Sequence, residues 1–288
     1  MNIQCDICGQ IGEWTKLFDV PGSDYKTQYA ILSCSSCQVK KTHPFPEDIA
    51  SLYKTNFYNQ KQNRLFSYCK GLLIQMEINR ITRSIPCRDF LDLGSGSGEF
   101  SRHLYRKGYS VICADAGAQR PYYIKTIDEL LYCPFDFDQY TFQNNPPLEG
   151  KGVILRHVLE HIKNPRALLE RLVQKKIKYF YIAVPNTECL EKKVFGPYDS
   201  LWYAPYHLWH FNKGSLMKLF NKTGISVMAT GCDTIPTILG CIWHYLLAHR
   251  CPDFLVKIFE PTGAKIIFSS PLNLFFRNNV VWIIGKVK

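Results

Sequence analysis

Residues 90–100 read FLDLGSGSGEF, a stretch that joins an apolar strand end to three glycines at alternate positions. Glycine adopts backbone conformations that other residues avoid, so a glycine cluster indicates that something approaches the main chain closely. Asp92 precedes the glycines, and Asp115 follows at the end of the next apolar run. A carboxylate at that place can accept hydrogen bonds from ribose hydroxyl groups. The stretch therefore predicts a nucleoside-binding loop.

The spacing of the glycines separates two kinds of nucleotide site. The dinucleotide fingerprint GxGxxG would place its third glycine at position 99, where this sequence has Glu99. A pyrophosphate prefers a helix start without carboxylates, whereas a zwitterionic or cationic ligand tolerates one. The pattern disfavours a Rossmann-like dehydrogenase or reductase.

Four cysteines near the start have the spacing of a metal site. Cys5 and Cys8 form one CxxC pair, and Cys34 and Cys37 form another. Each CxxC turn directs two thiolates to one point, and two such turns complete a tetrahedral zinc site. Four thiolate ligands leave no open position, so we expect a structural ion; ordinary reduced thiols or a redox pair are the alternatives.

The elements that position these residues follow from the apolar pattern. Pro44 and Pro46 interrupt regular structure, so we expect a zinc-binding module at 1–46 and a larger domain at 47–288. Beyond this junction helical and strand patterns alternate, which predicts a parallel sheet with helices on both faces. The expected helices are 62–81, 98–107, 164–177 and 213–223, and the expected strands are 88–93, 110–114, 152–158, 179–184, 226–230 and 280–287.

Four ordered motifs resemble those of class I S-adenosylmethionine-dependent methyltransferases. They are the DLGSGSG loop with its later acid, LRHVLEHIKNP at 155–165, VPN at 184–186 and YHLWHFNKGSLMKLFNKTG at 206–224. The likeness covers about residues 62–288 and implies an α/β, Rossmann-like seven-stranded fold that binds S-adenosylmethionine. It implies that the adenine lies near residues 127–137. Asp128, Asp136 or neither of them contacts the adenine. The resemblance places these residues at the donor: Asp92, Gly94, Ser95, Gly96, Gly98, Asp115, Arg156 and His157.

The catalytic candidates are histidines, because methylation of oxygen or carbon also removes a proton from the acceptor. They are His207, His157 and His210, and His161 is a further candidate. We favour His207, because residues 196–211 (GPYDSLWYAPYHLWHF) form a loop rich in Tyr, Trp and His that suits a sugar-like or flat polar substrate. The alternatives are a packed aromatic corner and, for His157, a partly buried histidine with satisfied hydrogen bonds.

The HVLEHI segment allows a second metal hypothesis. His157, Glu160 and His161 resemble the metal-binding cluster of ubiquinone-pathway O-methyltransferases, with His157 in place of the first acid. The alternative is that Glu160 and His161 only hold the loop in place.

Charge and resemblance together indicate the acceptor. The formal net charge of +11 predicts an anionic partner. A four-cysteine module before this core resembles sugar methyltransferases, including C-methyltransferases of deoxysugar pathways and enzymes of bacterial surface-polysaccharide clusters. We therefore expect a small anionic, sugar-linked acceptor. An rRNA or tRNA methyltransferase with a zinc ribbon and a donor-binding protein without activity are the rivals; dispersed basic residues and Asp6 in the first knuckle disfavour RNA.

The remaining expectations concern location. The N-terminal residues lack the pattern of a signal peptide, and twelve cysteines without an export signal indicate a reducing compartment, so we expect a cytoplasmic protein. Residues 234–277 contain apolar helical stretches with basic residues between them. We expect a helical insertion that forms a lid or packs on the core, with contact to a membrane surface or a dimer interface as alternatives.

Overall fold

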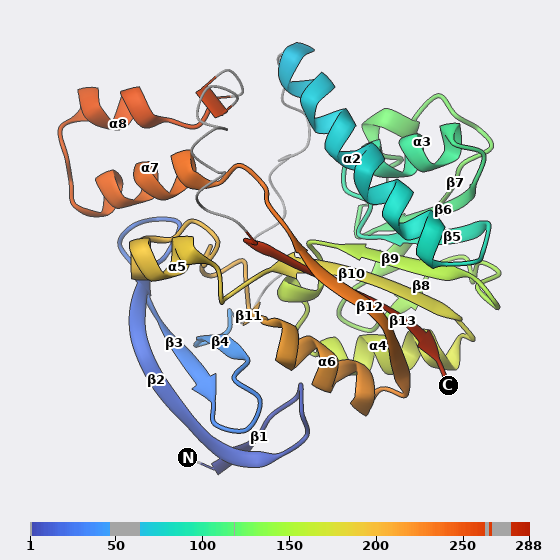
Figure 1. Cartoon of the computed structure of the whole chain (residues 1–288), viewed down its shortest axis with the longest axis horizontal. Helices are drawn as coiled ribbons and strands as arrows, with labels where there is room; N and C mark the ends of the chain where they lie inside the picture. The colour runs from blue at the N-terminus through green and yellow to red at the C-terminus, as the bar shows by residue number, and fades with distance from the viewer. Residues whose placement is uncertain (1, 47–63, 118, 263–264, 267–277) are drawn as a thin grey trace.

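The structure is a computed structural model that describes residues 2–46, 64–117, 119–262, 265–266 and 278–288. Its main sheet has the strand order β12-β13-β10-β9-β5-β6-β7-β8 (Figure 1). The strands are β5 (Asp89–Leu93), β6 (Ser110–Asp115), β7 (Leu131–Asp136), β8 (Thr141–Phe142), β9 (Gly152–Arg156), β10 (Tyr179–Pro185), β12 (Ile225–Asp233) and β13 (Val280–Val287).

This sheet is mixed, which corrects the expectation of a parallel sheet. Strands β10, β9, β5, β6 and β7 run parallel, whereas β13 lies antiparallel between β10 and β12, and the two-residue β8 is antiparallel to β7. The alternating pattern did not reveal this, because antiparallel neighbours need no crossover helix between them. The sheet thus holds the six strands expected by position, the additional strand β7, which completes the seven that the resemblance implies, and the two-residue β8.

Helices cover both faces of the main sheet. On one face lie α2 (Arg64–Ser84) and α3 (Glu99–Arg106), and on the other lie α4 (Pro165–Gln174) and α6 (Lys213–Lys222) (Figure 1). The side chains of Asn164 and Asn212 cap α4 and α6, because each accepts a hydrogen bond from a backbone N–H of the first turn. These helices match the expected ranges within a few residues.

A second, smaller sheet contains the N-terminal residues and one strand from much later in the chain. Its order is β1-β2-β3-β4-β11, with β1 (Asn2–Gln4), β2 (Ile11–Pro21), β3 (Gln28–Cys34), β4 (Lys40–His43) and β11 (Trp209–His210). Strand β11 belongs to the aromatic loop, so a segment expected in the larger domain completes the sheet of the smaller one. The domain boundary predicted between 46 and 47 lies where the described residues stop, and it stays a prediction.

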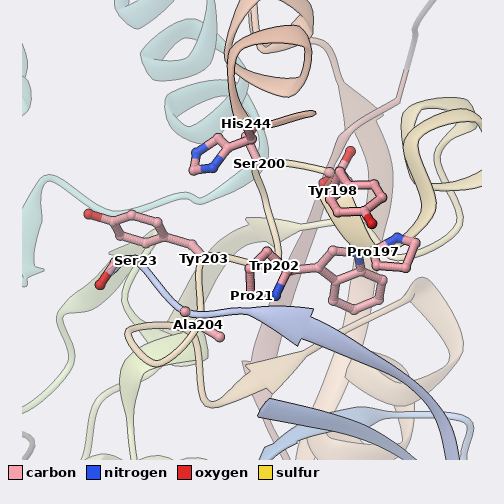
Figure 2. A pocket seen from close by; sticks show the side chains of 11 residues that line it. Pro21, Ser23, Pro197, Tyr198, Ser200, Trp202, Tyr203, Ala204 and His244 are labelled. Carbon is pink, nitrogen blue, oxygen red and sulfur yellow. The ribbon is translucent and has the colours of Figure 1, made fainter. Parts of the chain in front are cut away.

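The described part of 234–277 packs on the rest of the protein. Helix α7 (Ile238–Ala248) lies above α5 (Leu190–Phe195), and α8 (Asp253–Phe259) follows it (Figure 1). A pocket is lined by Pro21 at the end of β2, by Ser23 after it, by residues 197–200 and 202–204, and by His244 of α7 (Figure 2). The Tyr25 hydroxyl contacts His244 Nδ1, which joins α7 to the β2–β3 connection. Residues 263–264 and 267–277 of the expected insertion lie outside the described residues.

Among the residues that the structure describes, none of the helices combines the length and the apolar character needed to cross a bilayer.

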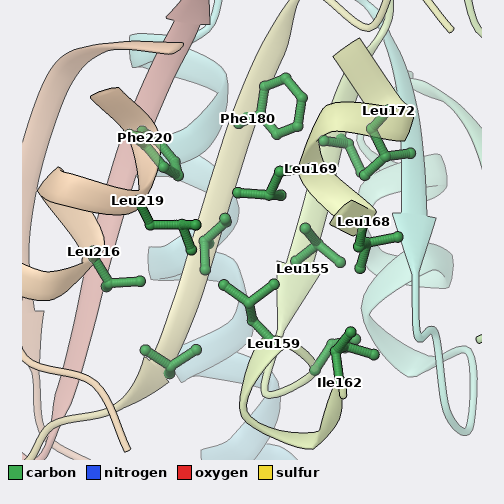
Figure 3. Close-up of a cluster of buried hydrophobic side chains, with 14 of the residues drawn as sticks. Leu155, Leu159, Ile162, Leu168, Leu169, Leu172, Phe180, Leu216, Leu219 and Phe220 are labelled. Atoms are coloured by element: carbon green, nitrogen blue, oxygen red, sulfur yellow. The ribbon is translucent and has the colours of Figure 1, made fainter. Parts of the chain in front are cut away.

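The hydrophobic core divides between the two faces of the main sheet because successive strand residues point in opposite directions. Leu91, Leu155 and Phe180 face α4 and α6, where they meet a cluster of leucines (Figure 3). Phe90 and Ile154 face α2 and α3. The buried cysteines of the small sheet belong to the same cluster as Leu91, so the two sheets share one core. This packing fixes the carboxyl ends of β5, β6 and β9, from which the site is built.

Candidate functional site

The glycine loop connects β5 to α3, and its backbone has the conformation that requires glycine. Gly94, Gly96 and Gly98 have φ angles of 79°, 53° and 77°. A Cβ atom at Gly94 would lie 2.3 Å from Cγ2 of Val158, so the residues after β9 press directly against the loop. The amides of Gly94 and Ser95 donate to the carbonyl of Ala114 at 2.7 and 3.1 Å. The loop is therefore held between β6 and the end of β9.

Asp92 lies beneath this loop as a buried carboxyl group. Only 2% of the residue is exposed, and Ser101 of α3 donates its hydroxyl to Oδ2 at 2.5 Å. Burial raises the pKa of Asp92 to about 6, although the Ser101 hydroxyl opposes the shift. Asp92 thus titrates much closer to neutrality than an exposed aspartate.

Asp115 stands at the end of β6 beside the same loop. Its carboxylate accepts hydrogen bonds from the amide of Gly96 at 2.6 Å and from the amide of Ala116 at 2.7 Å. Burial raises the pKa of Asp115, and the two amides oppose that shift. Ser95 Oγ is buried and has no hydrogen-bond partner among the described residues. A bare main chain, an acceptor and an unpaired hydroxyl fit a nucleoside ligand.

Arg156 is the last residue of β9, and His157 follows it. The Arg156 guanidinium lies against Glu77 of α2, with Nε and Nη2 at 2.9 and 2.8 Å from Oε2, and over the ring of Phe100 at 4.2 Å. Burial tends to raise the pKa of Glu77, but Arg156 and the Tyr181 hydroxyl outweigh it and lower that pKa. The predicted contact between Arg156 and the donor stays a prediction.

His157 adopts an unusual backbone conformation beside the glycine loop. Its φ angle is 53°, and its amide donates to the carbonyl of Ala183 at 2.8 Å. The side chain is 37% exposed, and Nδ1 lies 3.5 Å from Oε1 of Glu160. Val158, the next residue, packs closely against Gly94, so His157 lies beside the glycine loop.

The aromatic loop, residues 196–211, is largely packed. His207 is 8% exposed, and its Nδ1 lies 2.9 Å from the carbonyl oxygen of Leu201. His210 is 3% exposed, and its Nε2 lies 2.9 Å from Oγ1 of Thr42 in β4. Burial is the main cause that lowers the pKa of both histidines well below the usual value. The rings of Tyr203 and Tyr206 stack at 4.6 Å and are only partly buried.

The four N-terminal cysteines converge on one point. One Sγ atom from each of Cys5, Cys8, Cys34 and Cys37 lies within 4.8 Å of the others, and the Cys5–Cys37 separation is 3.8 Å. Four sulfurs about 2.3 Å from a tetrahedral zinc ion would be separated by about 3.8 Å. All four cysteines are buried, so the arrangement fits a closed four-thiolate zinc site.

The second cluster of metal-binding side chains in the structure differs in one member from the cluster that the sequence predicts. The described residues bring Glu160 and His161 together with His207, with one ligand atom from each within 4.8 Å. His157 had been expected as the third member, but His207 takes this place because the aromatic loop folds back over the 3₁₀ turn η2 (Leu159–His161). Periodicity within one segment could not reveal a contact with a segment 46 residues away.

Comparisons with known proteins decide the family. A family profile described as a methyltransferase domain matches residues 45–230. The chain belongs to the methyltransferase domain family. The comparison with curated proteins finds no match.

Solved methyltransferase structures share the fold. A putative sarcosine dimethylglycine methyltransferase from Galdieria sulphuraria has a TM-score of 0.50 and 13% identity, covering 78% of this chain and 91% of that chain. A putative methyltransferase from Bacillus halodurans C-125 has a TM-score of 0.50 and 14% identity, covering 73% and 97%. Magnesium protoporphyrin IX methyltransferase from Synechocystis PCC 6803, with bound SAH, has a TM-score of 0.49 and 12% identity, covering 81% and 91%.

The predicted class I methyltransferase fold is thus confirmed, and the enzyme is an S-adenosylmethionine-dependent methyltransferase. The region 127–137 contains β7, so the segment expected as a loop beside the adenine is mostly a strand, with Asp136 at its end. Sequence reasoning missed Ser101 and Glu77, which hold Asp92 and Arg156. The available signal was weak: each is a polar residue on the side of a helix that faces the sheet.

Proposed function

We propose that this methyltransferase transfers the methyl group of S-adenosylmethionine to a small anionic acceptor that carries a sugar. The observation that supports the donor half is the glycine loop, with Asp115 and an unpaired Ser95 hydroxyl at its edge. When bound, the donor supplies an electrophilic methyl group, so the protein has mainly to align the acceptor and to exclude water.

The residues that we propose to hold the donor lie along this loop. Asp115 accepts hydrogen bonds from the ribose, and the backbone from Gly94 to Gly98 lies against the amino acid portion. Asp92, at the base of the loop, is well placed to balance the positive charge of that portion once it has lost its proton.

Aromatic side chains and positive charge support a sugar-linked anion as the acceptor. The stacked, partly buried rings of Tyr203 and Tyr206 offer a flat apolar surface of the kind that packs against a sugar ring. The net charge of +11 favours an acceptor that carries phosphate groups. A nucleotide-linked sugar combines both properties.

For the proton of the acceptor we propose His157 in preference to His207. The side chain of His157 is 37% exposed and lies next to the loop, whereas His207 is buried and His210 lies within hydrogen-bond distance of Thr42.

We also propose that the four-thiolate site holds a structural Zn²⁺ ion that stabilises the small sheet.

The test is a methyl-transfer assay with radiolabelled S-adenosylmethionine and a panel of nucleotide-linked sugars, with RNA as a second panel. Methylation of a nucleotide sugar without methylation of RNA is the expected result. Asp115→Ala should weaken donor binding at least tenfold, while Asp138→Ala, an exposed acid beyond β7, should leave it unchanged. Methylation of RNA alone, with steep salt dependence, would contradict the proposed acceptor.

A further inference from the structure

Two segments far apart in the sequence meet beside the carboxyl end of β9. The amide of Leu208 in the aromatic loop donates to the carbonyl of Glu160 in η2 at 2.8 Å. Nδ1 of His161 lies 2.9 Å from the carbonyl oxygen of Tyr206. These two contacts hold the segments face to face and bring three side chains with metal-binding chemistry together.

The three side chains are those of Glu160, His161 and His207. One ligand atom from each lies within 4.8 Å of the other two, and the two imidazole rings meet edge to face with centroids 4.7 Å apart. Ligand atoms about 2.0–2.2 Å from a tetrahedral ion would be about 3.4 Å apart. A small inward movement of the side chains would therefore bring all three ligand atoms within coordination distance of one ion.

The Glu160 carboxylate carries the argument, because it is buried without a hydrogen bond to any described residue. The residue is 1% exposed, and neither of its oxygens takes part in a hydrogen bond with a described residue. Outside the cluster, Nδ1 of His157 lies 3.5 Å from Oε1 of Glu160. Burial of an uncompensated carboxylate is costly, and a bound cation removes that cost.

The hydrogen bonding of His207 leaves the correct atom for a ligand. Its Nδ1 lies 2.9 Å from the Leu201 carbonyl oxygen, which can only accept, so Nδ1 must carry the proton. The lone pair is then on Nε2. A histidine that binds a metal commonly donates its other ring N–H to a backbone carbonyl in this way. Nδ1 of His161 makes the same kind of contact with Tyr206.

We propose that Glu160, His161 and His207 bind one divalent transition-metal ion, such as Zn²⁺. Two imidazoles and one carboxylate favour a transition metal over Mg²⁺ or Ca²⁺, which prefer oxygen ligands. The site is distinct from the four-thiolate site, since it has three protein ligands and leaves a position for water or an acceptor oxygen. The inference goes beyond the proposed function and does not depend on the identity of the acceptor.

The competing explanation is a direct hydrogen bond between the Glu160 carboxyl group and one of the histidines. Such a bond requires a separation of at most about 3.2 Å, and neither Glu160 oxygen takes part in a hydrogen bond to the imidazoles. A metal ion accounts for a buried carboxylate that lies beside two imidazoles without a hydrogen bond to a described residue.

The test measures metal content and needs no turnover. The full-length protein is dialysed against Zn²⁺, and the bound zinc is measured by elemental analysis. We expect about two zinc ions per chain for the wild type and about one for Glu160→Gln and for His207→Ala. Glu191→Gln should retain both, because Glu191 is also a fully buried glutamate with an unpaired oxygen but lies outside the cluster.

Crystals of the wild-type protein grown with Zn²⁺ give a second measurement that does not rely on any variant folding. An anomalous difference peak between Glu160, His161 and His207, separate from the peak at the cysteines, is expected. A single peak at the cysteines, or a Glu160→Gln protein that binds as much zinc as the wild type, would overturn the proposal. Because metal content is measured without an acceptor, failure of the sugar assay leaves this result intact.

Discussion

At the residue scale, Gly94 is the position where a single added carbon has the clearest consequence. Its φ angle is 79°, and a Cβ atom would meet Val158 at 2.3 Å. Gly150 has a φ angle of 77° but nothing within 4 Å of such an atom, so it serves as a matched control. Both substitutions to Ala should lower the free energy of unfolding by about 1 kcal/mol through the backbone conformation.

The two variants should differ in donor binding. Gly94→Ala should bind S-adenosylhomocysteine at least tenfold more weakly by calorimetry, because Val158 or the loop must move. Gly150→Ala should bind it as the wild type does. Equal affinities in the two variants would show that the loop does not contact the donor.

Asp92 should make stability depend on pH. Its pKa is 3.8 in the unfolded chain and about 6 in the folded protein, so the folded state holds a proton that the unfolded chain releases. This contribution is complete below about pH 4 and is lost as the pH rises through about 6. Relative to Asp92→Asn, the free energy of unfolding of the wild type should fall by up to about 3 kcal/mol over that interval.

Urea unfolding of the donor-free proteins at a series of pH values measures this difference. The Asn variant keeps an acceptor for the Ser101 hydroxyl. The test uses the change with pH in the difference between the two unfolding free energies, because a difference that is the same at every pH does not report titration of Asp92. A difference that does not change between about pH 4 and pH 7 would mean that Asp92 is not desolvated in solution.

Individual site residues were predictable where they follow one another in the chain. The loop from Gly94 to Gly98 and the acid at Asp115 were identified because the requirement for glycine and the end of a strand are local properties. Ser101 and Glu77 were not, because their roles depend on how α3 and α2 pack over the sheet. Likewise, His207 joins Glu160 only through the fold of the aromatic loop.

At the scale of elements, the two asparagine caps should differ in strength. Asn164 is exposed and accepts only from the amide of Ala167 at 3.0 Å. Asn212 is buried, exchanges hydrogen bonds with Ser215 at both ends of a capping box and donates to Glu188 at 2.9 Å. Asn212 directly follows the aromatic loop, so its cap fixes where the chain becomes helical after that loop.

Asn164→Ala should therefore cost about 1 kcal/mol of unfolding free energy, and Asn212→Ala about 2 kcal/mol or more. Denaturant unfolding of both variants gives the comparison. If the two costs are equal, the buried contact with Glu188 contributes nothing beyond the cap.

Most elements were predictable from apolar periodicity and end signals, as α4 shows, with Asn164 and Pro165 at its start. The direction of β13 could not be predicted in this way. Its residues VVWIIGKV read as a strand of either direction, and only the path through α7 and α8 decides that it enters antiparallel. The pairing of β11 with β4 was also beyond reach, because a two-residue strand carries no period.

At the scale of the whole molecule, the four-cysteine cluster is connected to the aromatic loop through paired strands. Strand β4 follows the second cysteine pair and pairs with β11, and Trp209 of β11 packs with Trp14 and Phe45 at 6.3 and 5.7 Å. Loss of the proposed zinc ion should therefore loosen the aromatic loop as well as the N-terminal residues.

The variant Cys5→Ser with Cys34→Ser should lose the zinc ion and speed amide hydrogen exchange in β4 and β11, with little change in β5 and β6. Cys232→Ser, an exposed cysteine in β12, should match the wild type. Hydrogen exchange followed by mass spectrometry resolves these segments. Unchanged protection of β11 after zinc loss would mean that the two parts are independent.

The place of β13 has a consequence for synthesis on the ribosome. Strand β12 has β13 as its neighbour in the main sheet, and β13 also covers the open side of β10. Until residues 280–287 emerge from the exit tunnel, the nascent chain presents two unpaired strand edges, which chaperones or other chains can bind.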